Sequence, residues 1–467
     1  MRINPVRNFH QFFNRHIMKK KTIIPLLIIA LSFISINSWS QKREIRGKVL
    51  DKETLEAIPY SSISVKSTPI GTCSNYQGEF IFYYPDSLIN SELLISCIGY
   101  KTLSLELESF STNDITNIYL DPASYEISEV TIRANQMPAS DFVKQVIKNM
   151  HKNYARSPYY MEGFLRDKVF NLYDNKNVRL TEAAIEIVKK EFGGENRADR
   201  VKVFEIRNSY NYSKLGSSLK EKFNQIFWGY SKNNPAYVIL QNHDFTNPTT
   251  LRKLLKNDLY SINFSGMTIY DGKPVQIIDI KEEYVEFMFI RAKSIYAHNL
   301  IRLYIDSESY AMLKTELYWI DKHSKELFPS DLRNALLNDS IMGFSIKQYE
   351  KINENYYLKY ASFRGRIHDQ PDENEIGKTL YYNETELLIN KVVTNKKDFD
   401  RIKHRDLLEK EVPLWDMKYV YDPSFWKNYN ILIDKPLDTA VQKDLEKESP
   451  LNNQFIDAGV RNSKNPK

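Results

Sequence analysis

The residues best suited to catalysis are histidines, and their surroundings argue against a familiar hydrolase. His323 and Glu326 form an H-x-x-E pair, with His404 downstream as a candidate third ligand. A catalytic zinc needs three protein ligands and an open position. This pair, however, lies in a polar connection between two expected antiparallel strands, and so short a motif often arises by chance. We therefore expect a solvated loop, with a zinc-dependent hydrolase as the alternative.

An acidic stretch, His368-Asp369-Gln370-Pro371-Asp372-Glu373-Asn374-Glu375, is the second group of possible ligands. Calcium requires several carboxylates that converge at short range, and this spacing does not fit the EF-hand loop. We interpret the stretch as a solvated hairpin tip. The sequence also lacks G-x-S-x-G and any Gly-rich phosphate loop. It therefore predicts a protein without catalytic residues, metal or cofactor.

The chain has two cysteines, Cys73 and Cys97. In an oxidising compartment they could pair, but a sequence does not place their Cα atoms within bonding distance. A disulfide and two separately buried thiols both remain open, and we expect the thiols.

The N-terminus has the pattern of an export signal. Lys19-Lys20-Lys21 precedes an apolar run from Thr22 to Ile36, and Ser38-Trp39-Ser40 offers small residues for cleavage. Residues 1–40 are thus a predicted signal peptide, in which Met18 is an alternative start. An uncleaved anchor is the other interpretation.

The leader also changes the meaning of the net charge. The whole chain carries +6, and the first forty residues contribute all of it, through Arg2, Arg7, Arg15, Lys19, Lys20 and Lys21. The mature chain is therefore neutral. A neutral chain has no global electrostatic footprint for nucleic acid.

Residues 45–101 consist of short alternating runs separated by turn residues, which predicts a small β-sandwich. Asn75 and Gly78 are residue types that accept a positive φ. We therefore expect a hairpin turn between residues 71–74 and 79–83.

Four motifs in order make this region resemble the carboxypeptidase regulatory-like domain, a transthyretin-like sandwich. The turn at Cys73-Ser74-Asn75 and the packing position Cys97 depart from the family's usual residues. The resemblance implies a Greek-key sandwich over residues 41–134. The motifs are Gly47-Lys48-Val49-Leu50-Asp51, Gly71 to Phe80, Ser96 to Lys101, and Ile127-Ser128-Glu129-Val130-Thr131-Ile132.

A linker helix is expected over residues 135–158, with Ser140 as its N-cap. From 159 to 432 the pattern is mostly period two, which predicts a large curved antiparallel sheet or half-barrel. Asp271-Gly272 is a strong hairpin signal. Residues 433–467 form a C-terminal tail. The fold class is mainly β with minor α.

The stretch Tyr284–Ile290 is apolar on both alternating faces, so it is either covered on both sides or lines a cavity. Helices from residues 214–258 or from the C-terminal segment would fill such a hollow. Alternatively, the hollow is a groove for a lipid-sized or peptide-sized apolar ligand. The candidate lining is Val285, Phe287 and Phe289, or Tyr284, Met288 and Ile290.

Two further resemblances concern location. The stretch Tyr296 to Asp306 is loosely similar to a strand in the half-barrel of lipoprotein-carrier proteins. The overall arrangement, including Tyr421 to Leu432, looks like Bacteroidota envelope proteins that carry the sandwich before a β-rich domain of unknown function. The likeness implies an exported protein, in the periplasm or on the periplasmic face of the outer membrane, that binds an envelope protein or apolar ligand. An accessory of TonB-dependent outer-membrane uptake is an alternative. We expect no transmembrane span in the mature chain.

Overall fold

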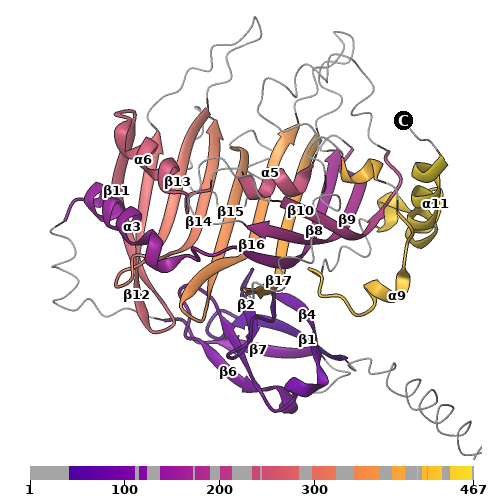
Figure 1. Ribbon diagram of the computed structural model, residues 1–467, viewed down its shortest axis with the longest axis horizontal. Helices are drawn as coiled ribbons and strands as arrows, with labels where there is room; N and C mark the ends of the chain where they lie inside the picture. The colour runs from indigo at the N-terminus through magenta and orange to yellow at the C-terminus, as the bar shows by residue number, and fades with distance from the viewer. Residues whose placement is uncertain are drawn as a thin grey trace, which may run out of the picture.

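The computed structural model describes residues 42–110, 115–123, 137–171, 174–189, 200–212, 234–241, 244–282, 297–321, 341–367, 381–394, 408, 413–417, 419–433 and 442–464. As predicted, the chain is mainly β. A small two-sheet unit lies at one end of the strands of a large sheet, and helices lie along that sheet (Figure 1).

The small unit is the predicted sandwich, in which a three-stranded sheet packs on a four-stranded sheet. Its apolar core includes Ile45, Phe80 and Phe82, which come from alternate positions of two paired strands. The first sheet has the order β4 (Glu79–Pro85), β1 (Lys42–Asp51), β7 (Ile115–Leu120). The second has the order β3 (Gly71–Cys73), β2 (Ser62–Val65), β5 (Glu92–Ser96), β6 (Leu103–Glu106), and the short helices are η1 (Asp86–Leu88) and η2 (Leu107–Ser109).

The predicted turn between β3 and β4 is confirmed. The Asn75 side chain accepts hydrogen bonds from the backbone N–H groups of Gln77 and Glu79, at 2.9 and 2.8 Å. Gly78 has φ +75°, and a Cβ there would collide with the Val49 carbonyl. Glycine is therefore required both by the backbone conformation and by the close approach of β1.

The large sheet has ten strands, all antiparallel to their neighbours. The predicted hairpin at Asp271-Gly272 is present, with φ of 51° and 71° at these two residues. Positive φ at both turn residues matches the right-handed twist of the strands. The order is β10 (Arg200–Asn208), β9 (Lys176–Lys189), β8 (Tyr159–Asn171), β17 (Tyr381–Val393), β16 (Asn355–Ile367), β15 (Ile341–Ile352), β14 (Met312–Asp321), β13 (Ala297–Asp306), β12 (Lys273–Glu282), β11 (Tyr260–Tyr270).

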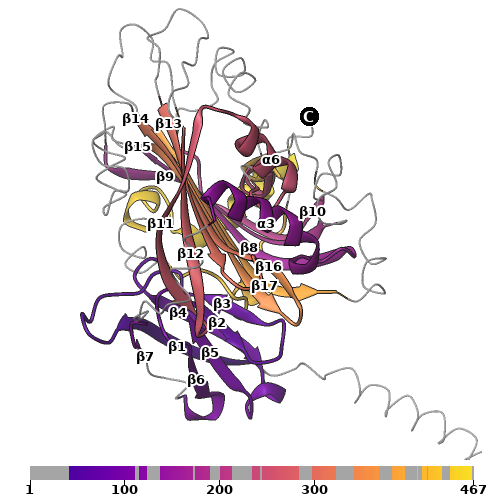
Figure 2. The same ribbon diagram turned by 90° about the vertical axis from the view of Figure 1, so that its left-hand side faces the viewer.

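Three helices lie on one face of this sheet: α3 (Ala139–Asn153), α5 (Pro235–Gln241) and α6 (Pro248–Lys256) (Figures 1 and 2). The expected N-cap of α3 was wrong. The cap position is Pro138, without a side-chain hydrogen bond, because the helix begins before Ser140. Asn247 caps α6 by accepting a hydrogen bond from the Thr249 N–H group.

The C-terminal region contributes helices near the β10 edge of the large sheet (Figure 1). These are η4 (Leu414–Asp416), α9 (Pro423–Trp426) and α11 (Leu451–Lys464), and α11 packs beside β10. In the part of the chain that the structure describes, no helix is both long and apolar enough to cross a membrane.

Candidate functional site

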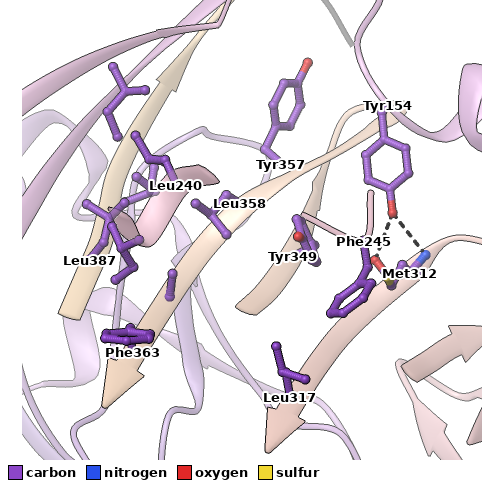
Figure 3. Close-up of a cluster of buried hydrophobic side chains, with 14 of the residues drawn as sticks. Tyr154, Leu240, Phe245, Met312, Leu317, Tyr349, Tyr357, Leu358, Phe363 and Leu387 are labelled. Atoms are coloured by element: carbon purple, nitrogen blue, oxygen red, sulfur yellow. Dashed lines mark hydrogen bonds between the residues drawn. The ribbon is translucent and has the colours of Figure 1, made fainter. Parts of the chain in front are cut away.

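The helix-covered face of the large sheet is apolar, and side chains from five or more strands meet there (Figure 3). Strand pairing places Leu165 between Ala183 and Leu387, and all three are fully buried. Phe363 is 1% exposed and contacts Trp319 edge to face, with ring centroids 5.7 Å apart. The face is therefore a continuous apolar core, because period-two alternation directs every second side chain toward the helices.

A buried cation holds α5 on this face. Lys347 is 3% exposed, and its Nζ donates a hydrogen bond to the Leu240 carbonyl at 3.1 Å. Leu240 lies near the C-terminal end of α5, where a positive charge is favourable. Burial opposes ionisation of Asp244, but the nearby Lys347 and Lys189 ammonium groups outweigh it and hold the pKa of Asp244 below its usual value. The buried Lys347 side chain thus fixes the C-terminal end of the helix.

A tyrosine fixes the end of α3 in the same way. The Tyr154 hydroxyl donates to the Met312 carbonyl at 3.3 Å and accepts from the Met312 N–H at 3.2 Å (Figure 3). Both groups are buried, so these bonds satisfy backbone atoms that water does not reach. Sequence analysis missed Tyr154, Lys347 and Asp244, since a polar residue within an apolar pattern does not reveal its partner.

The predicted groove residues, namely Tyr284, Val285, Phe287, Met288, Phe289 and Ile290, lie outside the described residues. The adjoining strands, β12 and β13, contribute Ile278, Ile280, Ile301 and Leu303 to the apolar core. Helices α5 and α6 come from residues 214–258 and fill the space over the described part of this face.

An open pocket of about 380 Å³ adjoins this core. It lies between residues 155–159, which connect α3 to β8, and the β15–β16 hairpin. Tyr159 and Tyr357 line it and meet edge to face, with centroids 4.9 Å apart. Tyr357 also belongs to the apolar core, and Figure 3 shows its hydroxyl directed away from the other labelled rings. The pocket is therefore a place where the apolar core approaches the surface.

The opposite face of the sheet carries a ladder of cross-strand charge pairs. Arg166 on β8 lies opposite Glu182 on β9, and its Nη2 is 2.7 Å from the carboxylate. The same carboxylate binds Arg207 on β10. Further cross-strand pairs are Lys168 with Glu384, Arg364 with Glu384, Lys359 with Glu350, and Arg302 with Asp279. Lys314 and Glu316 form a pair within β14.

Several members of this ladder are buried. Arg166 and Glu182 are 3% and 2% exposed. Burial disfavours the charged carboxylate, yet Arg207 and Arg166 outweigh it and lower the pKa of Glu182. The sequence signal for this ladder was the alternation of charges within strands, as in Glu384-Thr385-Glu386, and sequence analysis did not use it.

His323, Glu326, His404 and the acidic loop 368–375 lie outside the described residues. Across the ranges that are described, no group of three His, Cys, Asp or Glu side chains is placed to hold a metal ion.

Cys73 and Cys97 are both free thiols, as expected. Ser62 pairs with Cys73 on one side and with Ser96, the residue before Cys97, on the other, so β2 lies between the two cysteine positions. Two strand spacings amount to about 10 Å, which is too far for a disulfide.

Comparisons with solved structures give weak matches. One is to a proposed outer membrane lipoprotein-sorting protein domain from Vibrio parahaemolyticus, with 8% identity, TM-score 0.24, and coverage of 56% of this chain and 97% of that one. Another is to a DUF1329 family protein from Desulfovibrio piger, with 11% identity, TM-score 0.24, and coverage of 58% and 99%. A third is to a LolA superfamily protein from Nitrosomonas europaea, with 6% identity, TM-score 0.22, and coverage of 59% and 100%. These TM-scores are too low to carry an inference about function.

No curated protein matches the chain. The family comparison does give a match, which covers the N-terminal sandwich and leaves the large sheet unassigned. Residues 45–132 match the CarboxypepD_reg-like domain, so the resemblance inferred from the sequence motifs is confirmed for this part of the chain.

Proposed function

We propose that this chain is a non-enzymatic protein of the cell envelope, and that the large sheet binds an apolar ligand on its helix-covered face. The observation that carries the proposal is the pocket at Tyr159 and Tyr357, which adjoins the apolar core. Ligand sites are typically concave, lined by aromatic side chains, and equipped with a few polar groups. The ligand would pass between the end of α3 and the β15–β16 hairpin.

The stretch 284–290 remains the proposed inner lining. It joins β12 to β13, whose apolar side chains belong to the same core. A stretch that is apolar on both alternating faces can pack one set of side chains into the core and direct the other set toward a ligand. Lipid-like or peptide-like apolar chains fit such a lining.

A pair of adjacent substitutions tests the ligand site. Phe287→Ala and Met288→Ala change neighbouring residues, whose side chains would point to opposite faces of the proposed extended stretch. We expect one of them to weaken binding of the fluorescent probe N-phenyl-1-naphthylamine with little loss of stability. The other should lower the free energy of unfolding by about 2–5 kcal/mol, because it belongs to the packed core.

The matched control is Tyr357→Phe, which retains the ring at the pocket and should bind the probe like the wild type. If the wild type binds no probe, and both alanine variants lose stability to a similar degree, the apolar site does not exist.

Export is proposed on the leader alone. N-terminal sequencing of the mature protein should find a chain that begins near Gln41.

A further inference from the structure

The sandwich rests on the charged face of the large sheet, through hydrogen bonds and an apolar cluster. Ser62 Oγ donates to Glu350 at 3.1 Å, and the Gly99 N–H donates to the Ile269 carbonyl at 2.8 Å. Tyr60 stacks on Tyr360 with ring centroids 4.7 Å apart. We call the whole interface between the sandwich and the large sheet the seam.

A short C-terminal segment, Tyr421–Ile433, lies against both partners, and we call it the strap. On the sandwich side, Asn430 binds one residue of β4 twice: its Oδ1 accepts from the Tyr83 N–H at 2.6 Å, and its Nδ2 donates to the Tyr83 carbonyl at 3.0 Å. Asn75 donates to the Ile433 carbonyl at 2.6 Å. Since β4 is an edge strand, the strap satisfies backbone groups that have no neighbouring strand.

On the sheet side, the strap binds strand β8. The Tyr429 hydroxyl donates to the Gly163 carbonyl at 2.9 Å, and Arg166 Nη2 donates to the Leu432 carbonyl at 2.9 Å. The Trp426 ring lies over the Arg207 guanidinium, 4.3 Å from its carbon. The strap therefore covers the buried end of the charge ladder.

The seam and the strap can separate without opening either main core. The sandwich core and the helix-side core are distinct clusters, and the seam has a separate cluster, which includes Cys73, Phe164, Tyr360, Leu388, Trp426 and Leu432. Among the described residues, two buried donors beside the seam, Arg364 Nε and Trp426 Nε1, have no hydrogen-bond partner. Domains within one chain commonly move relative to one another unless their interface is large and hydrophobic.

We propose that the strap is a latch that holds the sandwich on the charged face of the sheet, and that its release frees the sandwich while both domains remain folded. The latch acts through Asn430, because this side chain joins the strap to the sandwich by two hydrogen bonds. This inference is independent of the proposed apolar ligand, which concerns the other face.

The two native cysteines report on the latch without added labels. Cys73 belongs to the cluster at the seam, where burial raises the pKa of its thiol to about 12. Cys97 follows Ser96, whose hydroxyl lies 3.3 Å from the Tyr270 hydroxyl of the large sheet. Cys73 is buried and Cys97 is half-buried in the docked state. Undocking should increase the accessibility of both thiols, whereas local fraying of β3 should expose Cys73 alone.

The experiment compares Asn430→Ala with Asn428→Ala in the full chain by thiol labelling with N-ethylmaleimide and mass spectrometry. Asn428 is an exposed strap residue, and the contact recorded for it, with Lys42 Nζ at 3.0 Å, uses its backbone carbonyl. Both cysteines should be labelled about tenfold faster in Asn430→Ala than in Asn428→Ala, because Asn430→Ala loses the two hydrogen bonds to Tyr83. The midpoint of global urea unfolding should be the same in both variants.

Equal labelling rates in the two variants would overturn the latch. So would faster labelling in Asn430→Ala that has the same urea dependence as global unfolding. Asn430→Asp keeps the acceptor for the Tyr83 N–H, so its rate should lie between the two. The wild type gives an independent check: labelling of both thiols at low urea should depend on urea more weakly than global unfolding does.

Discussion

The two faces of the ten-stranded sheet use the same strands and are stabilised in different ways. The helix-covered face is continuous apolar packing around residues such as Phe363 and Leu387. The other face is a ladder of paired charges, in which Glu182 joins two arginines. Apolar packing tolerates any neighbour of suitable shape, whereas a buried charge is stable only with specific partners.

This difference explains what covers each face. Helices α3, α5 and α6 supply apolar side chains to the first face, together with the few polar groups that orient them. The second face is covered by the sandwich and the strap, which provide hydrogen-bonding groups such as the Leu432 carbonyl. The first face is therefore closed by apolar packing, and the second by specific hydrogen bonds and charge pairs.

Removing a ring from the apolar face should have the largest effect. Phe363→Ala should lower the free energy of unfolding by about 3–5 kcal/mol, because it leaves a cavity in a packed core. Urea unfolding measures this loss, and Phe363→Leu, which keeps much of the apolar volume, should cost clearly less. A loss close to zero for the alanine variant would show that this part of the face is not packed.

Removing one charge from the ladder should have a smaller effect. Glu182→Gln keeps the shape of the side chain but leaves Arg166 and Arg207 without their carboxylate, which should cost about 1.5–3 kcal/mol at neutral pH. The pKa of Glu182 is lower in the folded protein than its usual value. Its contribution is therefore present above the unfolded pKa of about 4.3 and is lost as pH falls through the folded pKa.

The matching measurement is urea unfolding of wild type and Glu182→Gln across acidic and neutral pH. The difference in stability between them should shrink on acidification below about pH 4. A difference that stays constant over this range would contradict a role for the charge and would leave only shape.

An exposed charge pair on the sandwich should have the smallest effect. Lys66 and Glu92 are 2.8 Å apart, with side chains 52% and 36% exposed. Lys66→Ala should change the free energy of unfolding by about 0–1 kcal/mol, and less at high salt. A loss as large as that of Glu182→Gln would show that burial does not distinguish the ladder from ordinary surface pairs.

Much of the local structure was predictable because it depends on residue type and short spacing. Gly78 and Asp271-Gly272 adopt the positive φ values that their turns require. Helix α6 lies within residues 214–258, where helices were expected, and its cap, Asn247, is a typical one. The N-cap of α3 was wrong, because chain packing placed the start of the helix before Ser140.

The sequence by itself determined the sandwich, the alternation of the large sheet, and the zero net charge of residues 41–467. These follow from period-two patterns, turn residues and net charge, each of which is local or additive. The tertiary structure decided which side chains meet across the sheet. The pairing of Glu182 with Arg207, of Lys347 with Leu240, and of Asn430 with Tyr83 joins residues 25, 107 and 347 positions apart. Such contacts depend on strand order and register, which residue patterns along a single sequence do not predict.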